Sequence, residues 1–246
     1  MRIALLSDIH ANREAFSAVL ADCGQRDIDR YALLGDIVGY GPDPEWCVDT
    51  ARRLVAEGAV AVLGNHDSAI ANPKESMNPT ARAAIDWTRP RLTDDQRGFL
   101  AGLPLTAALG DAMLFHASAH SPGDWIYVTG LRGAMPCFRV SAARVMFCGH
   151  VHVPALYSQD MAERVHGHDP PIGSAMPLLT SRRWLAVVGS VGQPRDGSPQ
   201  AAYAIHDTAA NDLTFRRVAY DVAATAAKIR AAGLPDSLAA RLSEGR

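Results

Sequence analysis

The stretch that decides the fold runs from Ala59 to Asp67 and reads Ala-Val-Ala-Val-Leu-Gly-Asn-His-Asp. It begins with a short apolar run that contains β-branched residues, which is typical of a buried strand in a parallel sheet. Gly64 ends this run, and an amide, an imidazole and a carboxylate follow at Asn65, His66 and Asp67. In open α/β sheets, ligands bind beyond the carboxyl ends of the strands. A polar turn with an Asx-type hydrogen bond would have the same residues, so both interpretations stay open for this stretch alone.

The same change from an apolar strand to polar residues recurs in four other places. The predicted strands 2–7, 31–34, 112–115 and 143–148 lead into Asp8-Ile9-His10, Gly35-Asp36, His116 and Gly149-His150-Val151-His152. Residues two apart at the end of a strand point to the same side, so we expect Asp8 and His10 to pair, and likewise His150 and His152. If these strand ends are neighbours, all of these side chains share one crevice.

The order of the predicted elements indicates the fold class. Helices predicted from about 12 to 21 and from Pro44 onward separate the first three strands, which is typical of a parallel β-α-β-α-β start. Further helices are predicted at 78–87, 93–100 and 221–231, and further strands at 105–108, 153–157, 183–188, 200–206 and 213–218. We therefore predict an α/β fold (α+β in some schemes) with two sheets packed face to face. Residues 1–246 should form a single domain with a less regular segment at about 159–181.

The composition is that of an ordinary globular chain. Of the 246 residues, 48% are apolar and 20% are charged, and the net charge is −2. No apolar run approaches the ~20 residues of a membrane helix, and Asp8 comes too early for a signal peptide. We expect a cytoplasmic protein with no membrane partner and no dedicated nucleic-acid surface, because nucleic-acid binders usually carry a basic face. The four cysteines are scattered, which predicts reduced thiols.

The polar residues at the strand ends predict a metal site. They include carboxylates, an amide oxygen and four imidazoles, too many polar groups to be buried without partners. A pair of divalent ions would satisfy them, and two ions ~3.5–4 Å apart can grip phosphoryl oxygens. Mixed oxygen and nitrogen ligands without thiolate favour Mn²⁺, Fe, Zn²⁺ or Ni²⁺ over Mg²⁺ or Ca²⁺.

Taken together, these motifs resemble those of the calcineurin-like metallophosphoesterase superfamily. The blocks Asp8-x-His10, Gly35-Asp36, Gly64-Asn65-His66-Asp67, His116 and Gly149-His150-Val151-His152 occur in the family order. The segment 189–197, Gly-Ser-Val-Gly-Gln-Pro-Arg-Asp-Gly, resembles the tail motif of the small bacterial phosphodiesterase branch. The resemblance implies a four-layer α-β-β-α sandwich of two mixed sheets flanked by helices.

The resemblance also implies a role for each site residue. It assigns Asp8, His10 and His152 to one metal ion, Asn65, His116 and His150 to a second, and Asp36 to both. The cofactors would be two divalent transition metal ions, with Mn²⁺ preferred and Fe, Zn²⁺ or Ni²⁺ as alternatives. A metal-bridging hydroxide would attack phosphorus in line, His66 would act as the general acid, and Asp67 would orient His66 and raise its pKa.

Two further residues are candidates for binding substrate. Asn12 has a family counterpart that touches phosphate, with a helix cap as the alternative role. Arg195 offers a guanidinium that can bind two phosphate oxygens, with a salt bridge to Asp196 as the alternative. We expect the pocket walls to come from the segment 159–181 and from the surroundings of Trp125.

The predicted function is hydrolysis of a small phosphate ester, with phosphodiesters as the main substrates and phosphomonoesters as a second class. The alternatives are a phosphoprotein or nucleotide phosphatase, a nuclease, and a non-catalytic metal-binding scaffold of the same fold. The arginines of the protein-phosphatase branch are replaced by Gly39-Tyr40-Gly41 and Val62-Leu63, which favours a phosphodiesterase. The scaffold alternative is disfavoured because His66 and all seven ligand positions are present.

Overall fold

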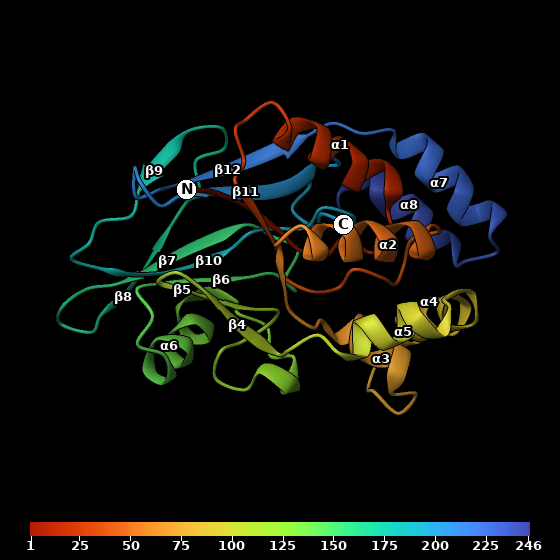
Figure 1. The fold of residues 1–246 in the computed structure, drawn as a ribbon, viewed down its shortest axis with the longest axis horizontal. Helices are drawn as coiled ribbons and strands as arrows, with labels where there is room; N and C mark the ends of the chain where they lie inside the picture. Colours follow the sequence, from red (N-terminus) through yellow and green to blue (C-terminus); the bar gives the residue numbers. More distant parts are fainter.

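Two mixed β-sheets of six strands each form the centre of the protein, in a computed structural model that describes residues 1–246 (Figure 1). The first sheet has the order β3 (Val60–Ala61), β2 (Arg30–Leu33), β1 (Arg2–Leu6), β11 (Ala201–Asp207), β12 (Asp212–Val218) and β9 (Ala175–Pro177). The second has the order β4 (Thr106–Leu109), β5 (Ala112–Phe115), β6 (Val145–Cys148), β10 (Arg183–Val187), β7 (Ala155–Gln159) and β8 (Val165–His168). The predicted pair of sheets is confirmed.

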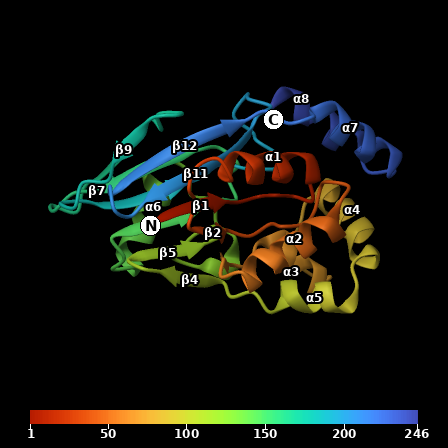
Figure 2. The same ribbon diagram turned by 45° about the horizontal axis from the view of Figure 1, so that its top comes forward.

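The helices pack on the outer faces of the two sheets or lie together beyond one end of the strands (Figure 2). They are α1 (Arg13–Cys23), α2 (Pro44–Ala56), α3 (Asn65–Ala71), α4 (Pro79–Thr88), α5 (Asp94–Ala101), α6 (Gly130–Val140), α7 (Val222–Ala231) and α8 (Asp236–Glu244). Short 3₁₀ turns occupy Arg89–Arg91 and Pro122–Asp124. Asn12, Asn78, Thr93 and Asp221 cap their helices through side-chain oxygens, as their sequence positions predict.

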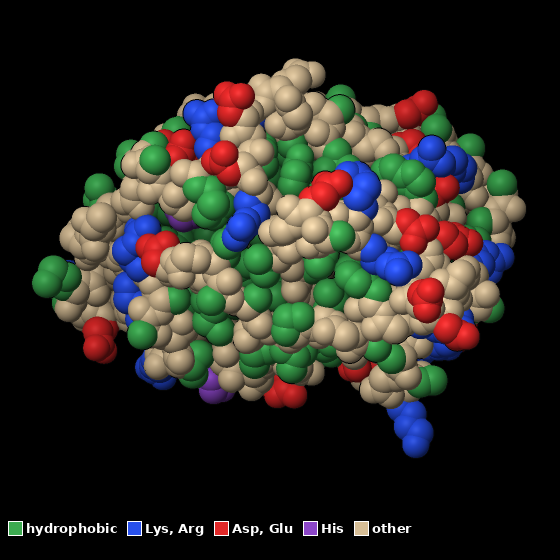
Figure 3. Space-filling view, viewed as in Figure 1, with side chains coloured by type: hydrophobic (Ala, Val, Ile, Leu, Met, Phe, Trp, Pro, Cys, Tyr) green, Lys and Arg blue, Asp and Glu red, His purple; other side chains and the backbone are tan.

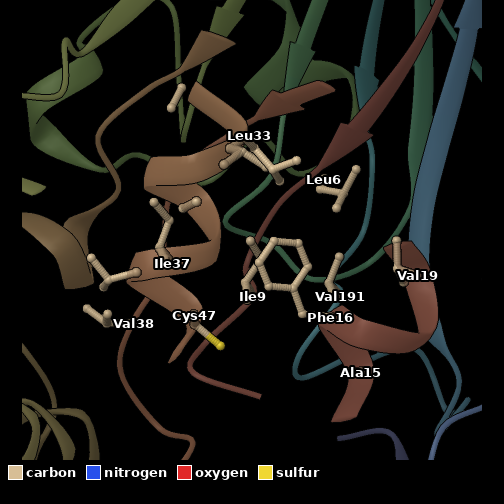
Figure 4. Packing of buried hydrophobic residues seen from close by; sticks show 14 of the residues in the cluster. Leu6, Ile9, Ala15, Phe16, Val19, Leu33, Ile37, Val38, Cys47 and Val191 are labelled. Carbon is tan, nitrogen blue, oxygen red and sulfur yellow. The ribbon is translucent and has the colours of Figure 1, made fainter. Parts of the chain in front are cut away.

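Alternation along each strand divides the core into layers. In β1, Ala4 and Leu6 belong to the cluster under α1 and α2, whereas Ile3 and Leu5 pack between the two sheets. Figure 4 shows Phe16 of α1 against the first of these clusters. A third cluster joins α6 to the outer face of the second sheet. Three hydrophobic layers between four structural layers are the α-β-β-α sandwich that the resemblance implies.

The parallel strands determine where the functional site lies. β1 pairs in parallel with β2, and β2 with β3. In the other sheet β6 pairs in parallel with both β5 and β10. The carboxyl ends of these strands therefore converge at one end of the sandwich.

Some elements differ from the prediction. β3 has only two residues, and Asn65 to Asp67 form the first turn of α3, which was not predicted. The segment 159–181, predicted as the less regular part of the chain, contains the short strands β8 and β9. His166 and His168 lie on β8, where they contact Asp160 and Ser158.

The surface and the cysteines agree with the composition. Figure 3 shows acidic and basic side chains interspersed on this face of the molecule. All four cysteines are buried free thiols, as predicted. None of the helices combines the length and apolarity that crossing a membrane requires.

Candidate metal centre and active site

The seven predicted ligands meet at the carboxyl end of the parallel strands. Five of them, Asp8, His10, Asp36, His150 and His152, adopt left-handed backbone conformations with φ between 50° and 65°. Such conformations are uncommon outside glycine and cluster at functional sites. The pairs of ligands therefore converge because the loops coil beyond the strands. The predicted reason, alternation along a strand, is wrong, since β1 already ends at Leu6.

The first group of ligands consists of Asp8, His10 and His152. Nδ1 of His10 donates to the carbonyl of Val38 at 3.1 Å, and Nδ1 of His152 donates to the carbonyl of Gln193 at 2.6 Å. In the neutral rings these bonds leave Nε2 as a lone-pair acceptor. The two Nε2 atoms face each other at 3.1 Å, and Nε2 of His152 lies 3.2 Å from Oδ1 of Asp8. Three electron pairs thus converge on one point.

The second group is built in the same way around His116. Its Nδ1 donates to the carbonyl of Leu34 at 2.7 Å, so in the neutral ring Nε2 carries the lone pair. That Nε2 lies 3.2 Å from Oδ1 of Asn65 and 3.1 Å from Nδ1 of His150. Donation of the second ring nitrogen to a backbone carbonyl is the usual arrangement of a metal-ligating histidine.

Asp36 lies between the two groups. Its Oδ2 atom is 3.4 Å from Nε2 of His116 and 3.7 Å from Nε2 of His10. Its Oδ1 atom accepts the backbone N–H of His66 at 2.8 Å, which fixes the carboxylate in place. This is the geometry expected of a carboxylate that two cations share.

The buried charges at the site require a cation. Asp8 and Asp36 are fully buried, and Oδ1 of Asp8 has no hydrogen-bond partner. Burial disfavours a charge on His116, but Asp36 outweighs that effect and raises the pKa of His116 to about 9. Burial lowers the pKa of His150 to about 3, so this ring stays neutral. The donor set therefore fits a pair of divalent ions, with nitrogen and oxygen atoms as the only ligands.

His66 is held beside the first group of ligands. It is 3% exposed, and its ring lies 4.8 Å from the ring of His10 and 4.4 Å from that of Tyr40. Nδ1 of His66 has no hydrogen-bond partner, and burial lowers the pKa of this ring to about 4. His66, His10 and Asp36 also form a compact group, so geometry alone would allow His66 as a ligand.

Asp67 bonds to the backbone, whereas its predicted role requires a contact with the ring of His66. Its carboxylate accepts the backbone N–H groups of Ile37, Val38 and Gly64, at 2.9 to 3.3 Å, and does not contact the ring of His66. Burial lowers the pKa of His66 to about 4. Asp67 instead ties the loop after β2 to the start of α3. It positions Asp36 and His66 through the backbone.

The two predicted substrate residues lie in different surroundings. Asn12 is 1% exposed, and its side chain bonds to Ala15, Gly192 and Thr225, which is the helix-cap alternative. Arg195 is half-buried beside the centre and does not pair with Asp196. Asp196 binds Arg217 instead.

The whole arrangement matches a known family. The family model of the calcineurin-like phosphoesterase superfamily domain matches residues 1–211. The chain belongs to that superfamily. An uncharacterised protein of Methanocaldococcus jannaschii is 35% identical over 254 aligned positions, which cover 99% of this chain and 98% of that protein.

Solved structures of similar chains agree with this assignment. A metallophosphoesterase from Sphaerobacter thermophilus is 41% identical, with a TM-score of 0.89 over 100% of this chain and 99% of that one. A hypothetical protein from Pyrococcus horikoshii is 20% identical and shares the fold, with a TM-score of 0.80 over 100% and 98% of the two chains. As a calcineurin-like phosphoesterase, the protein belongs to a superfamily of metal-dependent hydrolases.

An open cleft adjoins the ligands of this calcineurin-like phosphoesterase. A cavity of about 440 Å³ is lined by Asn65 and His150 and by the side chains of Tyr40, Glu75, Trp125 and Tyr127. The ring of Tyr127 stacks on that of His150 with centroids 4.1 Å apart. A second lobe of about 250 Å³ shares Tyr40 and Tyr127 and adds Arg195 and Arg241.

Several residues of the cleft could not be predicted from the sequence. The prediction that the segment 159–181 forms the pocket walls is wrong, because the loop that contains Glu75 takes that place. The surroundings of Trp125 do line the cleft, as predicted, and Nε1 of Trp125 donates to Glu75 at 3.0 Å. No motif in the sequence pointed to Arg241, which lies on α8 near the C-terminus.

Proposed function

We propose that this protein hydrolyses phosphodiesters with the help of two divalent metal ions. The observation that supports this most strongly is the convergence of two sets of lone pairs, His10 with His152 and His116 with Asn65, on either side of Asp36. When bound there, the two ions would supply positive charge for phosphoryl oxygens and would acidify a water molecule.

The residues of the chain would divide the remaining work. Asp8, His10 and His152 would hold one ion, and Asn65, His116 and His150 the other, with Asp36 shared. Asp67 would keep the loop of Asp36 and the first turn of α3 in register through its backbone hydrogen bonds. Tyr40 and Tyr127 would confine the substrate between the two lobes of the cleft.

His66 would donate a proton to the leaving oxygen. Its unpartnered Nδ1 and its place between His10 and Tyr40 support this role. In the free protein the ring is neutral, because burial lowers its pKa to about 4. The ring would therefore gain its proton only when a negatively charged substrate lies beside it, since an anion favours the protonated form.

The shape of the cleft supports a diester. A phosphodiester carries two substituents on phosphorus, and two lobes of about 440 and 250 Å³ meet at Tyr40 and Tyr127. A monoester would fill one lobe and leave the other to water. The family resemblance favours Mn²⁺ as the native ion, and the mixed nitrogen and oxygen ligands also suit Fe, Zn²⁺ or Ni²⁺ as alternatives.

The test is hydrolysis of bis-p-nitrophenyl phosphate and p-nitrophenyl phosphate by metal-stripped protein, with each ion added back separately. We expect metal-dependent cleavage with a higher kcat/KM for the diester, and loss of both activities in Asp36→Asn. Exposed His120 provides the control variant His120→Asn, which should behave as the wild type. Two bound ions without turnover of either ester would contradict the proposal and favour a non-catalytic scaffold.

A further inference from the structure

Two arginines beside the candidate centre lack a partner of opposite charge. Arg195 lies in the loop after β10 and Arg241 lies on α8, and both line the smaller lobe of the cleft. Neither forms a salt bridge, and Asp196, the nearest acidic residue in sequence, pairs with Arg217 instead. Two positive charges therefore face one cavity without a carboxylate.

The hydrogen bonds of this pair are also incomplete. Nη2 of Arg195 and Nη1 of Arg241 donate to the same atom, Oε1 of Gln193, at 2.8 and 3.1 Å. The Nε atoms of both arginines are buried and have no partner. A guanidinium has five N–H donors, so one neutral oxygen leaves most of this capacity unused. Two like charges on one neutral acceptor repel each other, and an anion between them would remove the repulsion.

The arginine pair is connected to the candidate centre. The backbone N–H of Arg195 donates to the carbonyl of His152 at 3.2 Å. The guanidinium carbon of Arg195 lies 5.8 Å from the centroid of the Tyr40 ring, which itself lies 4.6 Å from the ring of His10. Tyr40 thus separates the arginines from the ligands, and a substrate that fills both lobes passes over it.

We propose that Arg195 and Arg241 form a subsite for a second phosphate group of the substrate. Guanidinium groups bind phosphate oxygens in pairs, and this geometry selects phosphate over a neutral substituent. The inference rests on the proposed function, because it assumes that the cleft binds a phosphate ester as substrate. The substrate class would be a phosphate ester that carries a further phosphate beyond the scissile one.

The first test needs no activity. Inorganic phosphate is titrated into the metal-stripped full-length chain by calorimetry, because without ions the two carboxylates of the centre repel phosphate. We expect binding that weakens about tenfold in Arg195→Gln and in Arg241→Gln, since a hydrogen bond to a charged group is worth at least that much. Arg246→Gln is the matched control, because the side chain of Arg246 is 80% exposed.

Conservative variants protect this test against misfolding. Arg195→Lys and Arg241→Lys keep the charge and should retain more phosphate binding than the Gln variants. No binding by the wild type, or equal binding by the wild type and both Gln variants, would overturn the subsite.

The second test measures whether Arg195 and Arg241 contribute to substrate binding. In the metal-loaded protein, thymidine 5′-(p-nitrophenyl phosphate) is compared with the same ester carrying a 3′-phosphate. We expect the added phosphate to lower KM about tenfold in the wild type and much less in either Gln variant. Equal KM values for the two esters in the wild type would overturn the role in substrate binding.

The two tests fail separately. Phosphate binding that depends on the arginines, without hydrolysis of any ester, would remove the proposed function and leave the anion site. If the protein hydrolyses esters but its phosphate binding is unchanged in both arginine variants, the subsite is disproved and the proposed function stands.

Discussion

Nε2 of His10 and Nε2 of His152 face each other at 3.1 Å, while both Nδ1 atoms are committed to backbone carbonyls. Two neutral imidazoles in this arrangement direct lone pairs at each other, which is unfavourable unless a cation lies between them. The contact between these two residues is therefore evidence for a metal site.

His152→Ala should remove one of the two metal ions. The variant loses an imidazole of the first group and leaves the ligands around His116 in place. Metal content after loading with Mn²⁺ and gel filtration, measured by plasma mass spectrometry, should fall from two ions per chain to one. Unchanged metal content would show that His152 is not a ligand, and His120→Ala serves as the exposed control.

His66→Ala should keep both ions and lose turnover. Loss of a general acid costs about 10²- to 10⁴-fold, most where the leaving group is a poor one. We expect a larger fall in kcat for diphenyl phosphate than for bis-p-nitrophenyl phosphate, because nitrophenolate leaves without a proton. Loss of a bound ion in this variant would show instead that His66 is a ligand, which its group with His10 and Asp36 would allow.

Asp67→Ala should lower stability as well as activity. The carboxylate accepts three buried backbone N–H groups, and leaving them without an acceptor costs about 3 kcal/mol. Urea unfolding should show this loss, and Asp67→Asn should lose less because its amide oxygen still accepts. A variant with normal stability and reduced kcat would contradict this structural role and support the predicted role of Asp67 in orienting His66.

His206 should make the fold sensitive to acid. This residue of β11 is fully buried, neither ring nitrogen has a partner, and burial lowers its pKa from 6.5 to about 4. Below pH 6.5 the His206 ring is protonated in the unfolded chain but stays neutral in the folded chain until the pH approaches 4. The contribution of neutral His206 to the free energy of unfolding is therefore fully present above pH 6.5 and is lost as the pH falls toward 4.

The size of this effect can be measured by difference. The shift corresponds to about 3 kcal/mol between the two pH values. Urea unfolding at pH 7 and at pH 4 should show that His206→Leu loses less stability than the wild type by about this amount. An equal loss in both proteins would mean that folding does not lower the pKa of His206.

The sequence predicted the sheets, and which side chains converge at the site, for physical reasons. Short apolar runs that end in polar residues mark buried strands, and their order sets the parallel start through β1, β2 and β3. Helix α6 was missed because Pro136 lies inside it and Gly130 begins it, both of which oppose helix formation.

Two features of the site could not be predicted from patterns. The left-handed conformations of Asp8 and Asp36 depend on tertiary contacts, since residues other than glycine rarely adopt them. The cleft combines residues far apart in the chain, such as Glu75, Trp125 and Arg241. Local sequence patterns cannot predict that residues so far apart in the chain lie close together.

The most direct test of the account is the rate of bis-p-nitrophenyl phosphate hydrolysis as Mn²⁺ is titrated into metal-stripped protein. Bound ions are counted in the same samples, with Asp36→Asn as the control. The account predicts little activity until the second ion binds, and none in the variant. Full activity with one ion per chain, or activity that ignores metal altogether, would contradict a two-ion centre built around Asp36.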